Sequence, residues 1–85
     1  MRTTLSATDR EAVDGILAAV LAEPGLSNED LQRALQHPEF RVRKVLTVLR
    51  RQGKVGLVRF GPHQLPRWYP PAEALVIRAR FEREA

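Results

Sequence analysis

The residues best suited to chemistry lie in residues 38–55, which read PEFRVRKVLTVLRRQGKV. The cationic side chains of this stretch are Arg41, Arg43, Lys44, Arg50, Arg51 and Lys54. Guanidinium groups bind phosphate oxygens and the edge of guanine through paired hydrogen bonds, so a basic helix of this kind suits a polyanion such as nucleic acid. The alternative is a solvated surface helix with ion pairs between successive turns, but Glu39 is the single acid in the stretch. The pattern therefore favours contact with a polyanion.

The charge of the chain is unevenly distributed along its 85 residues. Residues 38–67 hold eight basic residues against Glu39 alone, whereas residues 1–37 hold six acids and three arginines. A formal net charge of +4 therefore understates how strongly one region is basic. Charge concentrated in this way indicates a surface directed at a polyanion.

The composition argues against several other kinds of site. The chain has no cysteine and two separated histidines, so neither a disulfide framework nor a clustered metal site is expected. A Gly-rich phosphate loop and a paired-carboxylate arrangement are also missing from the sequence. We expect no enzyme activity, no cofactor, no metal and no small-molecule ligand. No apolar run reaches the ~18 residues of a membrane-spanning helix, and the N-terminal residues are not a signal peptide, so we expect a cytoplasmic protein.

Helix signals begin near the N-terminus. Thr8-Asp9-Arg10-Glu11 has the pattern of a capping box, in which a Thr hydroxyl and a Glu carboxylate accept from each other's backbone amides. Apolar residues at helical spacing follow, namely Val13, Ile16, Leu17, Val20 and Leu21. Pro24-Gly25 ends this pattern. The sequence predicts a first helix over residues 8–23.

Two more helices are expected before the helical sequence pattern ends at Gly53. Ser27 and the acids after it mark the start of a short second helix over residues 28–36. Proline is favoured at the first helical position, so we expect the third helix to open at Pro38 and to cover residues 38–52. Gly53 then ends it.

After Gly53 the pattern of apolar residues is typical of extended strands rather than of a helix. Residues 54–69 read as a hairpin, with a six-residue tip over residues 61–66 that contains Gly61 and two prolines. A final helix is expected over residues 72–83. The fold class predicted for residues 1–85 is a single, mainly α domain with a small antiparallel β-hairpin.

This order of elements resembles the winged helix-turn-helix of bacterial transcription regulators of the MarR/ArsR kind. The residues that carry the resemblance are Leu26-Ser27, Leu31, Leu35, Val42, Leu46, Leu49, Gly53, Val55 and Arg67-Trp68-Tyr69. The resemblance implies a sequence-specific double-stranded DNA-binding protein, a small regulator associated with the nucleoid. It places the helix over residues 38–52 in the major groove and the hairpin wing on the minor groove or the backbone.

The resemblance also implies a set of DNA-binding residues. These are Ser27, Asn28, Arg41, Arg43, Lys44, Thr47, Arg51, Arg59, His63, Gln64 and Arg67. Arg41 and Arg43 are expected to face outward and contact bases, with Lys44 and Thr47 beside them. Ser27 and Asn28 are expected to offer amides and hydroxyls to a phosphate.

Two questions are left open by the sequence. The final helix, with Leu75, Val76 and Phe81, is expected to form a homodimer interface, but it could instead fold back over the first helix. Winged helices also serve as docking modules, so the alternative function is a protein-interaction module that binds an acidic partner without DNA.

Overall fold

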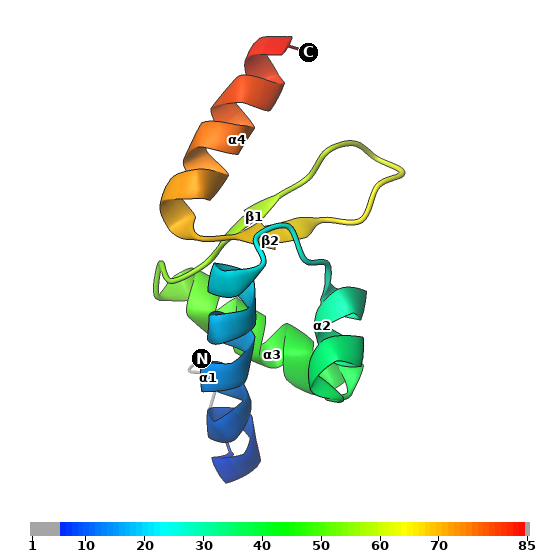
Figure 1. Ribbon diagram of the computed structural model, residues 1–85, viewed down its shortest axis with the longest axis vertical. Coiled ribbons are helices and arrows are strands. Elements are labelled where there is room, and N and C mark those ends of the chain that lie inside the picture. The colour runs from blue at the N-terminus through cyan, green and yellow to red at the C-terminus, as the bar shows by residue number, and fades with distance from the viewer. Residues whose placement is uncertain (1–5, 85) are drawn as a thin grey trace.

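The computed structural model describes residues 6–84 (Figure 1). Within this range the elements are α1 (Ala7–Ala22), α2 (Asn28–Leu35), α3 (Glu39–Arg51), β1 (Gly56–Val58), β2 (Arg67–Tyr69) and α4 (Pro71–Glu84). The predicted fold class, mainly α with a small antiparallel hairpin, is confirmed. Residues 1–5 and residue 85 of the predicted domain lie outside the described residues.

The capping box of α1 differs from the predicted one. Ser6, rather than Thr8, is the N-cap, and its hydroxyl accepts from the Asp9 amide at 3.1 Å. The Ser6 amide donates in return to Asp9 Oδ2 at 3.1 Å, so an aspartate makes the reciprocal bond that we expected from Glu11. The prediction was wrong because the Ser6–Asp9 pair has the same three-residue spacing and lies nearer the helix start.

Helix α2 begins after Ser27, as the sequence predicts, whereas helix α3 begins one residue later than predicted. Ser27 Oγ accepts from the Asp30 amide at 3.2 Å, which is a second reciprocal capping box. The helix ends at Leu35, and Gln36 adopts the left-handed conformation with φ of 55°. Pro38 is the N-cap of α3 rather than its first helical residue, and its carbonyl accepts from the Arg41 and Val42 amides.

The hydrophobic core lies where α1, α2 and α3 meet beneath the hairpin. Its largest fully buried side chains are Ile16, Val20, Leu31, Val42, Val45, Leu46, Leu49 and Val58. All of them except Val58, which comes from β1, recur at helical spacing on the inner faces of the three helices, and this fixes the opposite face of α3 as the solvent-facing one. Trp68 from β2 joins the same cluster.

The hairpin has a third backbone partner that the sequence did not indicate. Leu57 pairs with Trp68 across β1 and β2, and Leu26 forms an antiparallel bridge to Trp68 from the other side. The Trp68 amide donates to the Leu26 carbonyl and the Gly25 amide donates to the Trp68 carbonyl, both at 2.8 Å. The pairing of β1 and β2 is shorter than the predicted hairpin, so residues 59–66 form a longer tip than expected. The loop before α2 thereby holds the wing in place.

Helix α4 packs against the hairpin at its beginning and projects away from the body of the molecule beyond it (Figure 1). Ala74 is buried against Gly56, and the Arg78 guanidinium donates to the Leu57 carbonyl at 2.6 Å. Phe81 lies edge-to-face on Phe60. No helix in residues 6–84 is both long and apolar enough to cross a membrane.

Candidate nucleic-acid interface

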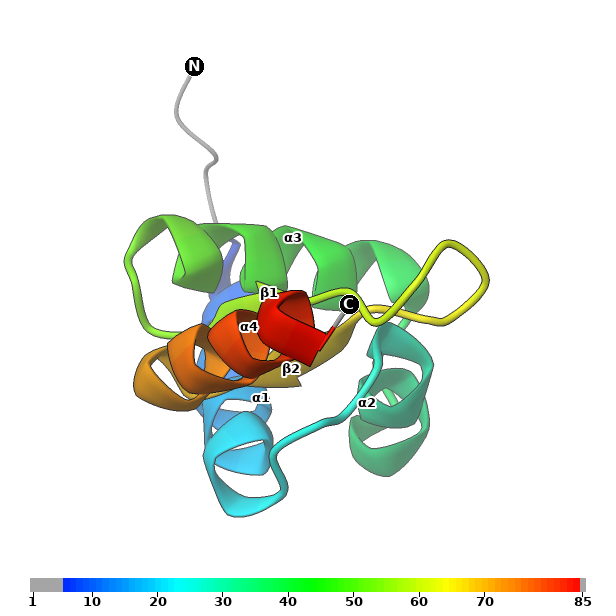
Figure 2. The ribbon, with the colours of Figure 1, turned by 90° about the horizontal axis from the view of Figure 1, so that it is seen from above.

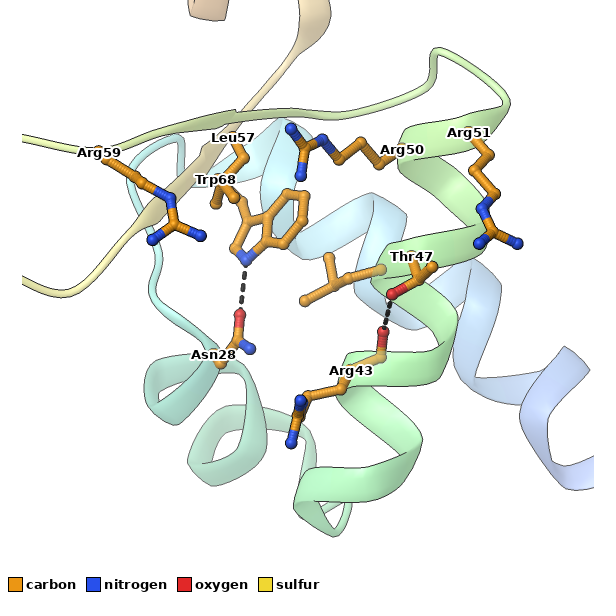
Figure 3. Close-up of a pocket in the computed structure, with 9 residues that line it drawn as sticks. Asn28, Arg43, Thr47, Arg50, Arg51, Leu57, Arg59 and Trp68 are labelled. Atoms are coloured by element: carbon orange, nitrogen blue, oxygen red, sulfur yellow. Dashed lines mark hydrogen bonds between the residues drawn. The ribbon is translucent and has the colours of Figure 1, made fainter. Parts of the chain in front are cut away.

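A groove of about 600 Å³ lies between α3 and the hairpin (Figure 3). Its lining residues are Asn28, Arg43, Leu46, Thr47, Arg50, Arg51, Leu57, Arg59 and Trp68. The buried side chains of Leu46 and Trp68 form its apolar base. Four of the lining residues are arginines, and the lining set contains no acid among the described residues. The groove is therefore strongly electropositive.

The arginines reach the groove from two elements. Arg43, Arg50 and Arg51 extend from α3, at helical spacing on its exposed face, while Arg59 follows β1 and faces them from the hairpin. In the view of Figure 3 the Arg59 guanidinium lies to the left of the Trp68 indole and the Arg50 guanidinium lies above it. Guanidinium groups converging from two walls suit an elongated, multiply charged anion.

Arg43 is the most accessible cation near the start of α3. Its side chain is 68% exposed and makes an ion pair with Glu39 at 3.6 Å. An exposed pair of this kind contributes little and exchanges readily for another anion. The Thr47 hydroxyl donates to the Arg43 carbonyl at 2.8 Å, which leaves its oxygen lone pairs and its methyl group for a ligand. Arg43 and Thr47 therefore lie outward as predicted.

Arg41 and Lys44 do not face outward as predicted. Arg41 Nε lies 3.3 Å from Asp9 Oδ1, and Lys44 Nζ lies 2.9 Å from Asp9 Oδ2. The Asp9 side chain is only 5% exposed, so both cations lean from α3 towards α1. The expectation failed because it considered acids within the basic stretch alone, and the acid that binds these cations comes from another helix.

Asp9, Arg41 and Lys44 form a cluster in which the Asp9 carboxylate is strongly paired. The hydrogen bond from Lys44, followed by that from the Ser6 amide, holds the pKa of Asp9 well below its ordinary value of 3.8. Asp9 is therefore charged at neutral pH and neutralises part of the charge on α3. The ion pairs of Asp9 with Arg41 and Lys44 connect α1 to α3 and stabilise the orientation of one helix on the other.

The residues at the start of α2 serve the fold. The Ser27 amide donates to Asp30 Oδ2 at 3.0 Å and its hydroxyl accepts from the Asp30 amide, so the predicted free amide is already bonded. Asn28 Oδ1 accepts from the Trp68 indole N–H at 2.6 Å (Figure 3). Asn28 lines the groove, and its side-chain oxygen positions Trp68, which leaves its side-chain N–H groups for a ligand.

The predicted wing residues lie in three places. Arg59 lines the groove, and His63 and Gln64 are exposed on the hairpin tip. Figure 2 shows this tip projecting past the end at which α3 begins. Arg67 Nη1 donates to the Gly25 carbonyl at 2.8 Å, so this guanidinium braces the loop before α2.

Two groove residues were missed by sequence reasoning. Arg50 is not among the predicted DNA-binding residues, although it follows Arg43 by seven residues and Thr47 by three, which is the spacing of one helical face. Trp68 is not among the predicted DNA-binding residues either; it is buried in the core, yet it also lines the groove. The helical spacing could have identified Arg50, but no sequence signal distinguishes the second role of Trp68.

Solved structures that are similar in fold to this chain include the following three. The first, a cysteine-to-serine mutant of Lactococcus lactis ZitR, is 17% identical with a TM-score of 0.65, and the match covers 93% of this chain and 54% of that one. Streptococcus pneumoniae FabT in complex with DNA is 17% identical with a TM-score of 0.58, covering 93% and 53%. Wild-type Lactococcus lactis ZitR in complex with DNA is 18% identical with a TM-score of 0.57, covering 96% and 53%.

These matches confirm the winged helix-turn-helix fold expected from the sequence. The chain spans about half the length of the solved structures that it matches. No protein-family model and no curated protein sequence matches the chain.

Proposed function

We propose that this protein binds double-stranded DNA in a sequence-specific manner and acts as a small transcriptional regulator. The observation that carries the proposal is the groove, in which four arginines and no acid of the described residues line the exposed side of the second helix of a helix-turn-helix. Two of the matched structures, of FabT and ZitR, contain DNA, which supports the same use of the fold here. In this proposal α3 enters the major groove and the hairpin tip meets the minor groove or the backbone.

The position of each side chain along the groove indicates whether it contacts bases or phosphates in the proposed complex. Residues near the start of a recognition helix reach base edges, so Arg43 and Thr47 are the residues proposed to read sequence. Arg50, Arg51 and Arg59 lie farther along the groove, where side chains meet phosphates.

The remaining predicted residues take supporting parts in this proposal. Arg41 and Lys44 orient α3 through Asp9 instead of reading bases. His63 and Gln64 meet the duplex from the hairpin tip, where they are exposed. Arg67 braces the wing through Gly25.

We further propose that two copies pair through α4. This helix exposes 65% of Leu75, 58% of Val76 and 38% of Phe81. Pairing through these side chains removes apolar surface from water and allows two α3 helices to bind half-sites about 34 Å apart, one turn of DNA. Light scattering at tens of micromolar should give twice the chain mass, and Leu75→Glu should give a monomer. A monomeric wild-type protein would contradict the dimer.

Selection of bound duplexes from a random pool tests binding and sequence preference together. We expect the wild-type protein to enrich a defined site, and Arg43→Ala to relax the preference at one or two base pairs. Arg80→Ala on α4 removes the same charge at an exposed position outside the groove and should leave the selected site unchanged. If no duplex is enriched at low salt, the DNA-binding proposal is wrong, and a module that docks on an acidic protein becomes the better explanation.

A further inference from the structure

An exposed phenylalanine stands at the start of the helix that we propose to enter DNA. Phe40 is the second residue of α3 and is 65% exposed. Together with Arg43, Lys44 and Thr47 it lines a shallow cavity of about 380 Å³ on the outer face of the helix. At this position the ring is accessible to a ligand that approaches the outer face of the helix.

The spacing places Phe40 on the same face as the proposed base-reading residues. Phe40, Arg43 and Thr47 follow one another at i, i+3 and i+7, which is one stripe along a helix. This stripe lies opposite the buried stripe that holds α3 to the core. Phe40 is therefore the apolar member of the surface that contains Arg43 and Thr47, at the end of the helix where side chains reach base edges.

The ring is also held in place before any ligand arrives. The guanidinium carbon of Arg41 lies 5.4 Å from the centroid of the Phe40 ring, which is a cation–π contact. Arg41 is itself fixed by the buried Asp9 at 3.3 Å. The contacts run from α1 through Arg41 to the ring, so less conformational freedom is lost when the ring docks.

We infer that Phe40 is a specificity-determining residue that packs on the C5-methyl group of a thymine in the major groove. The inference rests on the proposed DNA binding. A phenyl ring cannot hydrogen-bond to the acceptors and donors of the base edges, and the thymine methyl is the one apolar group that the major groove offers. Phe40 then selects thymine over cytosine at one position, beside the base pair read by Arg43.

The test removes the methyl group without changing any hydrogen bond. In the duplex selected by the wild-type protein, each thymine is replaced in turn by deoxyuridine, and affinity is measured by fluorescence anisotropy. Burial of one methyl group predicts that the wild-type protein loses about fourfold in affinity at one thymine. Phe40→Ala should bind more weakly and show no difference between thymine and deoxyuridine there. Because Phe40 is exposed, this variant should keep its circular dichroism spectrum and its Tm.

A matched control separates this contact from a general loss of apolar surface. Leu21→Ala truncates a side chain that is also exposed, but on α1, and it should keep the fourfold effect of the methyl group. Equal affinity for thymine and deoxyuridine at every position, or the same methyl effect in Phe40→Ala, would overturn the inference while DNA binding stands. Failure to select any duplex would instead contradict the proposed function itself, and the inference with it.

Discussion

The groove arginines determine how steeply DNA binding should depend on salt. Four arginines line the groove, and in the proposed complex each brings one positive charge that offsets one phosphate charge, Arg43 at the base edges included. Every neutralised phosphate releases condensed counterions and lowers log K by about 0.9 per tenfold rise in salt, so four contacts give a slope of about −3.6 for each bound protomer. Raising the salt from about 50 to about 200 mM should then weaken binding by about 150-fold.

Replacing single arginines by glutamine should reduce that slope in steps. Glutamine keeps a polar head on a shorter stem but removes the charge, so Arg50→Gln should give a slope of about −2.7 and a weakening of about 40-fold over the same salt range. The double variant Arg50→Gln/Arg59→Gln should give about −1.8 and about 12-fold. Arg50 and Arg59 suit this test because no ion pair or side-chain hydrogen bond of theirs is found within residues 6–84, so the substitutions break no such interaction among these residues.

The assay is fluorescence anisotropy of a labelled duplex at five or more salt concentrations. Arg80→Gln on α4 is the matched control, because it changes the net charge equally at an exposed position that does not line the groove. It should shift affinity slightly and leave the slope at about −3.6. The reasoning is refuted if Arg80→Gln flattens the slope as much as Arg50→Gln, since binding would then follow net charge rather than the groove.

Two further predictions concern stability. Gly56→Ala should destabilise the protein by about 1–3 kcal/mol in urea unfolding, because the added Cβ would overlap the Cβ of the buried Ala74. Gly15→Ala should instead stabilise it by about 0.5–1 kcal/mol, because Gly15 lies inside a helix and the nearest atom to the added Cβ is 3.9 Å away. Equal effects of the two substitutions would contradict the steric explanation. The carboxyl pKa of Asp9 is lower in the folded chain than its ordinary value of 3.8 in the unfolded chain. The pairing of the charged carboxylate with Lys44 therefore stabilises the fold at pH values above 3.8, and this stabilisation is lost as the pH falls from there towards the lower pKa of the folded chain. The urea midpoint of the wild-type protein should therefore fall more steeply between about pH 5 and about pH 2 than that of Asp9→Asn, and parallel curves would contradict this role.

The fold could be predicted largely because its signals are local. Ser27 with Asp30 marks the start of α2, and the apolar stripe of α3 marks both its length and its buried face. The same reasoning missed the cap of α1, where two overlapping patterns compete, and the bridge between Leu26 and Trp68, which joins segments far apart in the sequence. Local patterns report helices well, but they do not report which distant segment a strand will pair with.

The candidate site was predictable to the extent that exposure follows from helical spacing. Subtracting the buried stripe of α3 correctly left Arg43 and Thr47 outside. It could not place Arg41 and Lys44, because their partner Asp9 lies on another helix and its position depends on how α1 packs on α3. An ion pair between distant residues is a tertiary property, so it appears only when the helices are assembled.

The position of Trp68 gives the groove an optical reporter. The chain contains one tryptophan, and its indole forms part of the groove base while donating to Asn28. The emission of an indole depends on the polarity and hydration around it, and this indole borders the space that a ligand would fill. Occupation of the groove should therefore change the intrinsic fluorescence of the unlabelled protein, and a titration at a single wavelength can follow binding from the protein's side.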